Sequence, residues 1–172
     1  GQSIGSILIT VNGDEVAEPN EIFNVNLIDT NADLSGITTG VVTILNDDAT
    51  PVVGIVGASF NETDTVGDPV ATLTLTMSGV GSQSTVTVDF TTANGTAIAD
   101  GVLTLGTDDY DAITPGVVTF APGTVSTTID VTLNGDEVFE GDETFNVEIT
   151  NVVNADLGTG SVATVTIVDD EV

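Results

Sequence analysis

The sequence contains no lysine, arginine or histidine among its 172 residues, whereas aspartate and glutamate together number 27, so the formal net charge is −27. Nucleic-acid binding depends on lysine and arginine to displace counterions from phosphates, and this function is therefore excluded. An anionic membrane surface would repel the chain for the same reason. The lack of basic side chains also removes the base of a serine triad and the amine of a Schiff base.

Cysteine is absent as well. Without cysteine and histidine the chain can build no zinc, haem or iron–sulfur site, and it has no thiol chemistry. The groups that remain are carboxylates, hydroxyls, amides and the single phenol of Tyr110. Oxygen ligands of this kind suit a hard cation, above all calcium.

Aromatic side chains are few, namely six phenylalanines and one tyrosine, and no apolar run is long enough for a membrane-spanning helix or a signal peptide. A pair of carboxylates could in principle serve a glycosidase, but the sequence offers too few aromatic rings to line a sugar cleft. We therefore expect no enzyme and no membrane insertion. The chain is nevertheless 40% hydrophobic with a mean hydropathy of +0.34, which is enough to bury a core and argues against a disordered acidic tail.

Alternating apolar and polar residues recur along the chain and predict half-buried strands. Leu73, Leu75 and Met77 alternate with threonines, and the segments 85–90 and 145–150 show the same period of two. Asn-Gly, Gly-Asp and Pro-Gly pairs lie between such segments and are typical of turns. Short strands joined by polar turns favour an antiparallel sandwich or barrel.

An internal repeat divides the chain. The segment ILITVNGDEVAEPNEIFNVNL at 7–27 returns as IDVTLNGDEVFEGDETFNVEI at 129–149, an offset of 122 residues. After a shift of one residue, the Val-Thr-Ile at 42–44 returns at 165–167, whereas residues 50–115 have no earlier counterpart. The chain is therefore expected to hold the C-terminal part of one repeat, 1–48, and a complete repeat, 49–172, as in a tandem array.

Seven strands are predicted in the complete repeat, with a Gly- and Asp-rich loop over 93–111. They lie near 52–58, 70–78, 85–92, 116–120, 126–133, 144–151 and 161–168.

The first 48 residues contain counterparts of only the last three strands, near 6–11, 22–28 and 40–46. Three strands cannot close a sandwich, so their apolar faces and edges need a partner. The missing strands would come either from a longer polypeptide or from a neighbouring subunit by strand addition. In both cases we expect 1–48 not to be a free-standing domain.

The carboxylates of the complete repeat gather in four clusters. These are Glu62 with Asp64; Asp108, Asp109 and Asp111; Asp136, Glu137, Glu140, Asp142 and Glu143; and Asp169, Asp170 and Glu171. Each cluster alone could equally be a solvated acidic turn, because aspartate favours turns. Two of the clusters recur together in residues 1–48, however, and no basic residue can neutralise them, so a bound cation is favoured.

Three motifs in order connect the sequence with a known family: FAPG at 120–123, GDEVFEGDETF at 135–145 and VTIVDD at 165–170. With them the chain resembles the Calx-beta repeat over about residues 52–171, and over 1–48 as a C-terminal part-copy. The resemblance implies an all-β fold, an immunoglobulin-like, seven-stranded antiparallel β-sandwich. The family includes regulatory domains of sodium–calcium exchangers and many large bacterial surface proteins.

The resemblance also implies calcium ligands at one end of the sandwich. By motif match they are Glu62, Asp109, Asp136, Glu140, Glu143, Asp169, Asp170 and Glu171 in the complete repeat, and Asp14, Glu18, Glu21, Asp47 and Asp48 in the part-copy.

We interpret the sequence as an extracellular, calcium-binding structural module of a prokaryotic repeat adhesin, surface fibre or filament. Calcium at the domain ends would make the array rigid, with neighbouring repeats or subunits as its partners. Two alternatives remain open: a calcium-sensing regulatory domain, and a metal-free acidic spacer whose charge keeps its neighbours apart.

Overall fold

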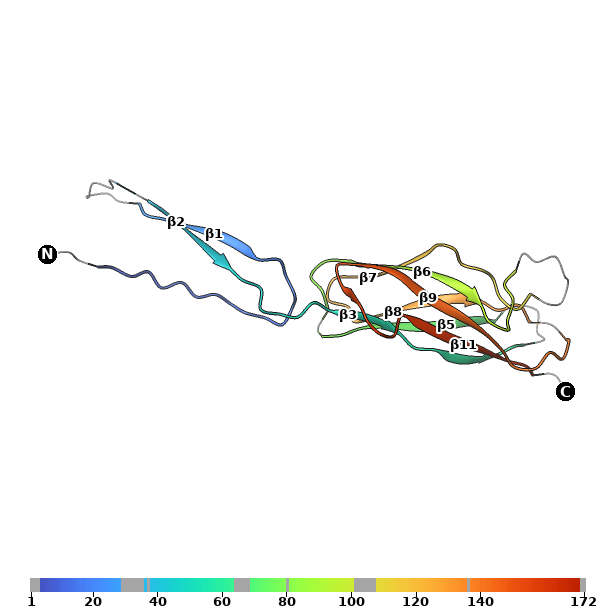
Figure 1. Ribbon diagram of the computed structural model, residues 1–172. Helices are drawn as coiled ribbons and strands as arrows, with labels where there is room; N and C mark the ends of the chain where they lie inside the picture. The colour runs from blue at the N-terminus through green and yellow to red at the C-terminus, as the bar shows by residue number, and fades with distance from the viewer. Residues whose placement is uncertain are drawn as a thin grey trace.

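The computed structural model consists of strands and loops. The residues that it describes form no helix, and hence none long and apolar enough to cross a membrane. The described residues are 4–28, 36, 38–63, 69–79, 81–100, 108–135 and 137–170. The molecule is elongated, with a thin two-stranded part toward the N-terminus and a sandwich toward the C-terminus (Figure 1).

The complete repeat is a sandwich of two sheets, as expected. The first sheet has the order β10-β3-β5-β8, formed by Asp156–Leu157, Val52–Ile55, Val70–Met77 and Ser126–Thr132. The second has the order β4-β11-β9-β6-β7, formed by Ala58–Asn61, Val162–Val168, Glu143–Val153, Val86–Asn94 and Gly116–Phe120.

The core lies between these two sheets and follows the predicted alternation. Every second residue of β5 is buried, so that Leu73, Leu75 and Met77 point inward and the threonines between them face solvent. The inner faces of β6 and β9 are built in the same way. The aromatic centre of the core is Tyr110 stacked on Phe145, with ring centroids 4.1 Å apart and planes inclined by 13°. The alternation alone was therefore enough to predict the core face of each long strand.

The strand predicted at 52–58 is in fact two strands that belong to opposite sheets. β3 pairs antiparallel with β5, and β4 pairs parallel with β11. The chain changes sheets at Gly57, where any Cβ would collide with the carbonyl oxygen of Thr164. Together with the short β10, this crossover gives the described part of the complete repeat nine strands in place of the seven predicted.

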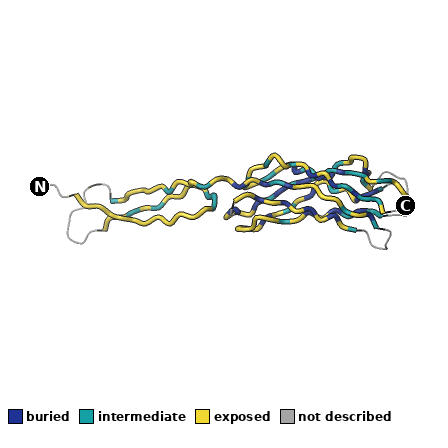
Figure 2. The backbone as a smooth tube through the Cα atoms, turned by 90° about the horizontal axis from the view of Figure 1, so that it is seen from below, coloured by how far each residue is buried: buried dark blue, intermediate teal, exposed yellow. Residues whose placement is uncertain are grey.

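The described residues of the N-terminal part-copy contain one strand pair, β1 (Glu21–Asn26) and β2 (Thr39–Ile44). Residues 6–11, predicted as a strand, belong to none. Their counterpart in the complete repeat is β8, which pairs with β5, and residues 1–48 contain no counterpart of β5. A strand cannot form without a neighbour to receive its hydrogen bonds, so the segment stays extended and unpaired. Figure 2 shows the result: the part-copy is almost wholly exposed, whereas buried residues fill the sandwich.

The crossover at Gly57 gives a direct test of the fold. We expect Gly57→Ala to destabilise the chain by about 1–3 kcal/mol, the usual cost of forcing an extra methyl group into a packed site. The matched control is Gly54→Ala in β3, where an added Cβ would lie 3.6 Å from the nearest atom, the carbonyl oxygen of Gly160. Urea unfolding measures both, and equal stability of the two variants would contradict the crossover.

Candidate metal centre

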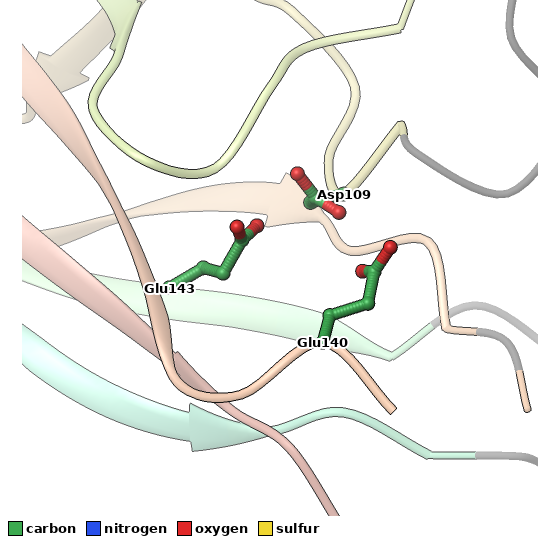
Figure 3. A group of neighbouring side chains, drawn as sticks. All are labelled: Asp109, Glu140 and Glu143. Carbon is green, nitrogen blue, oxygen red and sulfur yellow. The ribbon is translucent and has the colours of Figure 1, made fainter. Parts of the chain in front are cut away.

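Three carboxylates meet at one end of the sandwich. Asp109 comes from the segment that leads to β7, Glu140 from the loop between β8 and β9, and Glu143 is the first residue of β9. Each offers a carboxylate oxygen, and these oxygens all lie within 4.8 Å of one another. Figure 3 shows the three side chains pointing toward one another from separate segments of the chain.

Backbone hydrogen bonds and the core hold Asp109 in place. Its Oδ2 accepts a hydrogen bond of 2.6 Å from the Ile98 N–H, and its own N–H donates to the Ile98 carbonyl oxygen at 2.8 Å. The next residue is the fully buried Tyr110, whose hydroxyl donates to Asn94 Oδ1 at 2.6 Å. Asp109 is itself only 6% exposed, so its carboxylate is positioned before any ligand arrives.

Two further acids reach the same end because β4 and β11 run parallel. Val168 pairs with Asn61, so the residues that follow, Asp169 and Glu62, leave the sheet side by side. The Glu62 N–H donates to the Val168 carbonyl oxygen at 2.9 Å. Asp169 Oδ2 accepts from the Gly141 N–H at 2.9 Å, which ties the end of β11 to the loop that carries Glu140.

The carboxylates at this end repel one another, because all of them carry negative charge when ionised. Burial, a hydrogen bond with Asp109 and the nearby charges of Asp109, Glu140 and Glu62 raise the pKa of Glu143 from its ordinary 4.5 to about 7. In addition, Asp108 Oδ1 is buried with no hydrogen-bond partner. A buried oxygen without a partner and a carboxylate that resists ionisation both indicate a place that favours a cation. The donor set is all oxygen, which fits calcium.

The structure brings some of the predicted ligands of the complete repeat together and leaves others apart. Asp109, Glu140 and Glu143 are brought together, and Glu62 and Asp169 lie at the same end. Asp170 is exposed beyond the end of β11. Asp136 and Glu171 fall outside the described residues. Asp108 was not among the predicted ligands, although its position beside Asp109 in an acidic run was a signal that could have included it.

Comparison with known protein families identifies the family of this chain. The Calx-beta domain model matches residues 1–49 and again residues 46–171. The chain belongs to the Calx-beta family.

Similar proteins of known sequence are sodium/calcium exchangers. Sodium/calcium exchanger 1 of Mus musculus is 37% identical over 117 residues, and that of Rattus norvegicus is 36% identical over the same length. Each match covers 58% of this chain but 11% of the exchanger, so this chain spans only a small part of the length of those proteins.

Solved structures confirm the sandwich fold. The calcium binding domain CBD12 of CALX1.1 matches with a TM-score of 0.57 and 23% identity, over 69% of this chain and 45% of that one. The apo-form Calx CBD1 domain matches with a TM-score of 0.56 and 22% identity, over 71% of this chain and 99% of that one.

The acids of the Calx-beta part-copy surround a pocket of their own. Its volume is about 340 Å³, and its lining includes Asp14, Glu18, Glu21, Asp47 and Asp48, the five ligands predicted there. Burial and the charges of Asp47, Asp14 and Glu15 raise the pKa of Asp48. Among the described residues, only the Asp109 group brings three carboxylate oxygens within 4.8 Å, so the part-copy set is looser. Residues 1–48 contain no counterparts of Glu62 and Asp109, which complete the cluster of the other repeat.

The two Calx-beta units meet at a joint beside this pocket. Ala17 forms a parallel bridge with Ser82, and the Gln83 side-chain amide donates to Glu18 Oε1 at 2.6 Å. Asn46 stands where the complete repeat has Asp169, and its Oδ1 accepts from the Glu18 N–H at 3.0 Å. Glu18, the counterpart of Glu140, therefore takes part in the contact between the two units.

The raised pKa of Glu143 predicts how calcium-free protein responds to pH. A folded-state pKa of about 7 against about 4.5 unfolded means that folding favours the protonated carboxyl. The protonated Glu143 carboxyl therefore adds to the free energy of unfolding. This contribution is complete below pH 4.5 and is lost as the pH rises toward 7. In chelator, we therefore expect the stability of the wild-type chain to fall between those values more steeply than that of Glu143→Gln.

The control for this titration is Glu148→Gln, a change of the same type farther along β9. Both variants remove one carboxylate, so they reduce the general repulsion equally. Because Glu148→Gln leaves the Glu143 carboxyl in place, its stability should fall with pH as steeply as that of wild type. Urea unfolding at a series of pH values measures the slopes. A slope in Glu143→Gln equal to the wild-type slope would contradict the raised pKa.

Proposed function

We propose that this chain is a calcium-binding structural module of an extracellular tandem-repeat protein. The observation that carries the proposal is the convergence of Asp109, Glu140 and Glu143 at one end of a sandwich that has no basic side chain to neutralise them. A calcium ion takes about six to eight oxygen ligands, and this end of the domain is rich in them. The family match and the similarity to CBD12 of CALX1.1, a calcium binding domain, support this assignment.

The residues that would hold the ion come from loops that are otherwise far apart in sequence. Asp109, Glu140 and Glu143 would form the centre, and Glu62, Asp169 and Asp170 would stand at its margin. The motif match adds Asp136 and Glu171 to this set. The ion would supply the positive charge that the chain lacks, and in doing so it would tie four loops together. A stiff domain end is what a rod of repeats requires.

The joint between repeats would be stiffened in the same way. Asp47 and Asp48 lie between β2 and β3, and with Asp14, Glu18 and Glu21 they line the part-copy pocket. An ion bound there would restrain the linker on which the orientation of the two repeats depends. The composition also supports a location outside the cell, at the surface of a prokaryote. A chain without lysine or arginine has no bond that trypsin-like proteases cleave, which is an advantage there.

A calcium sensor is the second candidate, favoured by the similarity to sodium/calcium exchangers. A sensor uses the same ion to change the state of another domain, so it needs an effector in the same protein. The full-length gene would distinguish the two, because an array of further repeats supports the structural role and a transporter or enzyme domain supports the sensor.

Calcium should stabilise the folded chain by mass action, because the cluster exists only in the folded state. At free calcium about 100-fold above the dissociation constant, we expect about 2.7 kcal/mol and a melting temperature roughly 10 °C higher than in chelator. Magnesium should be much less effective, since it demands stricter octahedral geometry. Glu140→Gln and Asp136→Asn should reduce the calcium effect, and Asp89→Asn in the middle of β6 should leave it unchanged. An equal melting temperature in calcium and in chelator would support the metal-free spacer instead.

The joint makes a separate prediction. Calcium should narrow the range of orientations of the part-copy relative to the sandwich, which small-angle scattering measures as a narrower distribution of distances. The double variant Asp47→Asn/Asp48→Asn should lose this narrowing and keep the calcium-induced rise in melting of the complete repeat. If the scattering of wild type is the same in calcium and in chelator, the stiffened joint is wrong.

A further inference from the structure

We propose that Asn134 and Gly135 form a site of spontaneous deamidation, whose product disturbs the carboxylate cluster of Asp109, Glu140 and Glu143. The modification is covalent and takes place on two residues that are not among the predicted metal ligands. Its effect on the metal centre rests on the proposed function, whereas the reaction itself needs no metal.

Asn-Gly pairs occur three times in the chain, at 12–13, 94–95 and 134–135. Asparagine followed by glycine is especially prone to deamidation, because glycine has no side chain to hinder ring closure and its backbone is the least restricted. If the sequence alone decided the rate, the three pairs would react alike. The structure distinguishes them, because different contacts hold the three asparagine side chains.

The reaction requires water and no enzyme, oxidant or cofactor. The main-chain nitrogen of Gly135 loses its proton to water and attacks Cγ of Asn134. A new C–N bond closes a succinimide ring, and the bond from Cγ to the side-chain nitrogen breaks, so that ammonia leaves. Water then opens the ring at either carbonyl carbon and gives aspartate or isoaspartate. In isoaspartate the main chain runs through the side chain and is longer by one methylene group.

No contact keeps the reacting groups of Asn134 and Gly135 apart. Both residues lie in the loop after β8, outside any strand, and both are half-buried. The Asn134 N–H donates to the Asp109 carbonyl oxygen at 3.0 Å. Within the described part of the chain, however, no hydrogen bond engages the Asn134 side-chain amide or the Gly135 N–H. The amide can therefore turn toward the glycine nitrogen without breaking a hydrogen bond.

Asn94 shows the opposite arrangement. It is the last residue of β6 and pairs with Phe145 in β9. Its Oδ1 accepts two hydrogen bonds, one of 2.6 Å from the hydroxyl of the fully buried Tyr110 and one of 3.1 Å from the Ala99 N–H. Ring closure at Asn94 requires that both bonds break and that the end of β6 opens, so the same dipeptide should react more slowly there.

The position of Asn134 connects the reaction with the metal centre. On one side, its N–H holds the main chain of Asp109. On the other, Gly135 lies so close to Thr63, the residue after Glu62, that any Cβ at Gly135 would collide with the Thr63 carbonyl oxygen. Isoaspartate would lengthen the main chain between these two contacts, where there is no room for an added methylene group. It should therefore shift Asp109 relative to Glu62.

The test ages the complete chain in chelator at mildly alkaline pH, which promotes loss of the glycine proton. Peptide mass spectrometry after digestion with pepsin follows the amide-to-acid mass change at each Asn-Gly pair, and the exposed Asn12 is the unrestrained reference. We expect Asn134 to react at least about tenfold faster than Asn94, because only Asn94 must first lose two hydrogen bonds. In urea, the three pairs should react at similar rates.

The matched control is Asn134→Gln, which keeps the amide but would have to close a larger and less favourable ring. After equal ageing, the calcium-induced rise in melting temperature should be smaller in wild type than in Asn134→Gln. An equal rise in the two aged proteins would overturn the assigned effect on the metal centre.

The proposal would also be overturned by equal rates at Asn94 and Asn134 in the folded chain, or by a difference that persists unchanged in urea. Because these rates are measured in chelator, they do not depend on calcium binding. Absence of a calcium effect in fresh wild type would instead contradict the proposed function.

Discussion

Repulsion between carboxylates that no basic side chain can neutralise is the constraint on which the structure depends. The fold does not avoid it but concentrates it, because parallel pairing of β4 with β11 delivers Glu62 and Asp169 to the end where Asp109 already lies. The core gives Asp109 no freedom to move away, since Tyr110 is packed on Phe145 directly beside it. The raised pKa of Glu143 is the consequence: without a cation, this carboxyl holds its proton up to a pH of about 7. A cation at this end would act on the whole sandwich, because each acid is attached to a different strand or loop.

The sequence predicted some parts of this arrangement and not others, for physical reasons. Alternation in β5 and β9 predicted their buried faces, because side-chain direction in a strand is a local property. The division of 52–58 between two sheets was missed, since it depends on the closeness of Gly57 to Thr164, more than 100 residues away. The motif match grouped Asp109 with Glu140 and Glu143, but the partnerless oxygen of Asp108 emerges only from how the loops pack.

The joint shows how one substitution alters the use of the same loop. Asp169 in the complete repeat accepts a hydrogen bond from Gly141, and a carboxylate can do nothing more there than accept. Asn46 at the corresponding place accepts from the Glu18 N–H and also donates to the Asp48 carbonyl oxygen at 2.8 Å. An amide therefore links the loop to the linker through direct hydrogen bonds and removes one negative charge. The side-chain amide of Gln83, from the complete repeat, completes the contact by donating to Glu18 Oε1.

The shared register of β1–β2 and β9–β11 bears on how such a repeat assembles. In one copy the pair is enclosed by a sandwich, and in the other it is exposed, yet Phe23 pairs with Val42 as Phe145 pairs with Val165. The same register with and without the surrounding strands indicates that it is set within the pair itself. The segment 6–11 behaves in the opposite way, because its counterpart β8 needs a neighbour more than 50 residues distant and forms no strand without one. The pairing of β1 with β2 is thus present without the rest of the sandwich, whereas the pairing of β8 depends on a distant strand. A pair of strands alone is only marginally stable in water, so β9 and β11 gain stability from β6 and β4, which flank them in the five-stranded sheet.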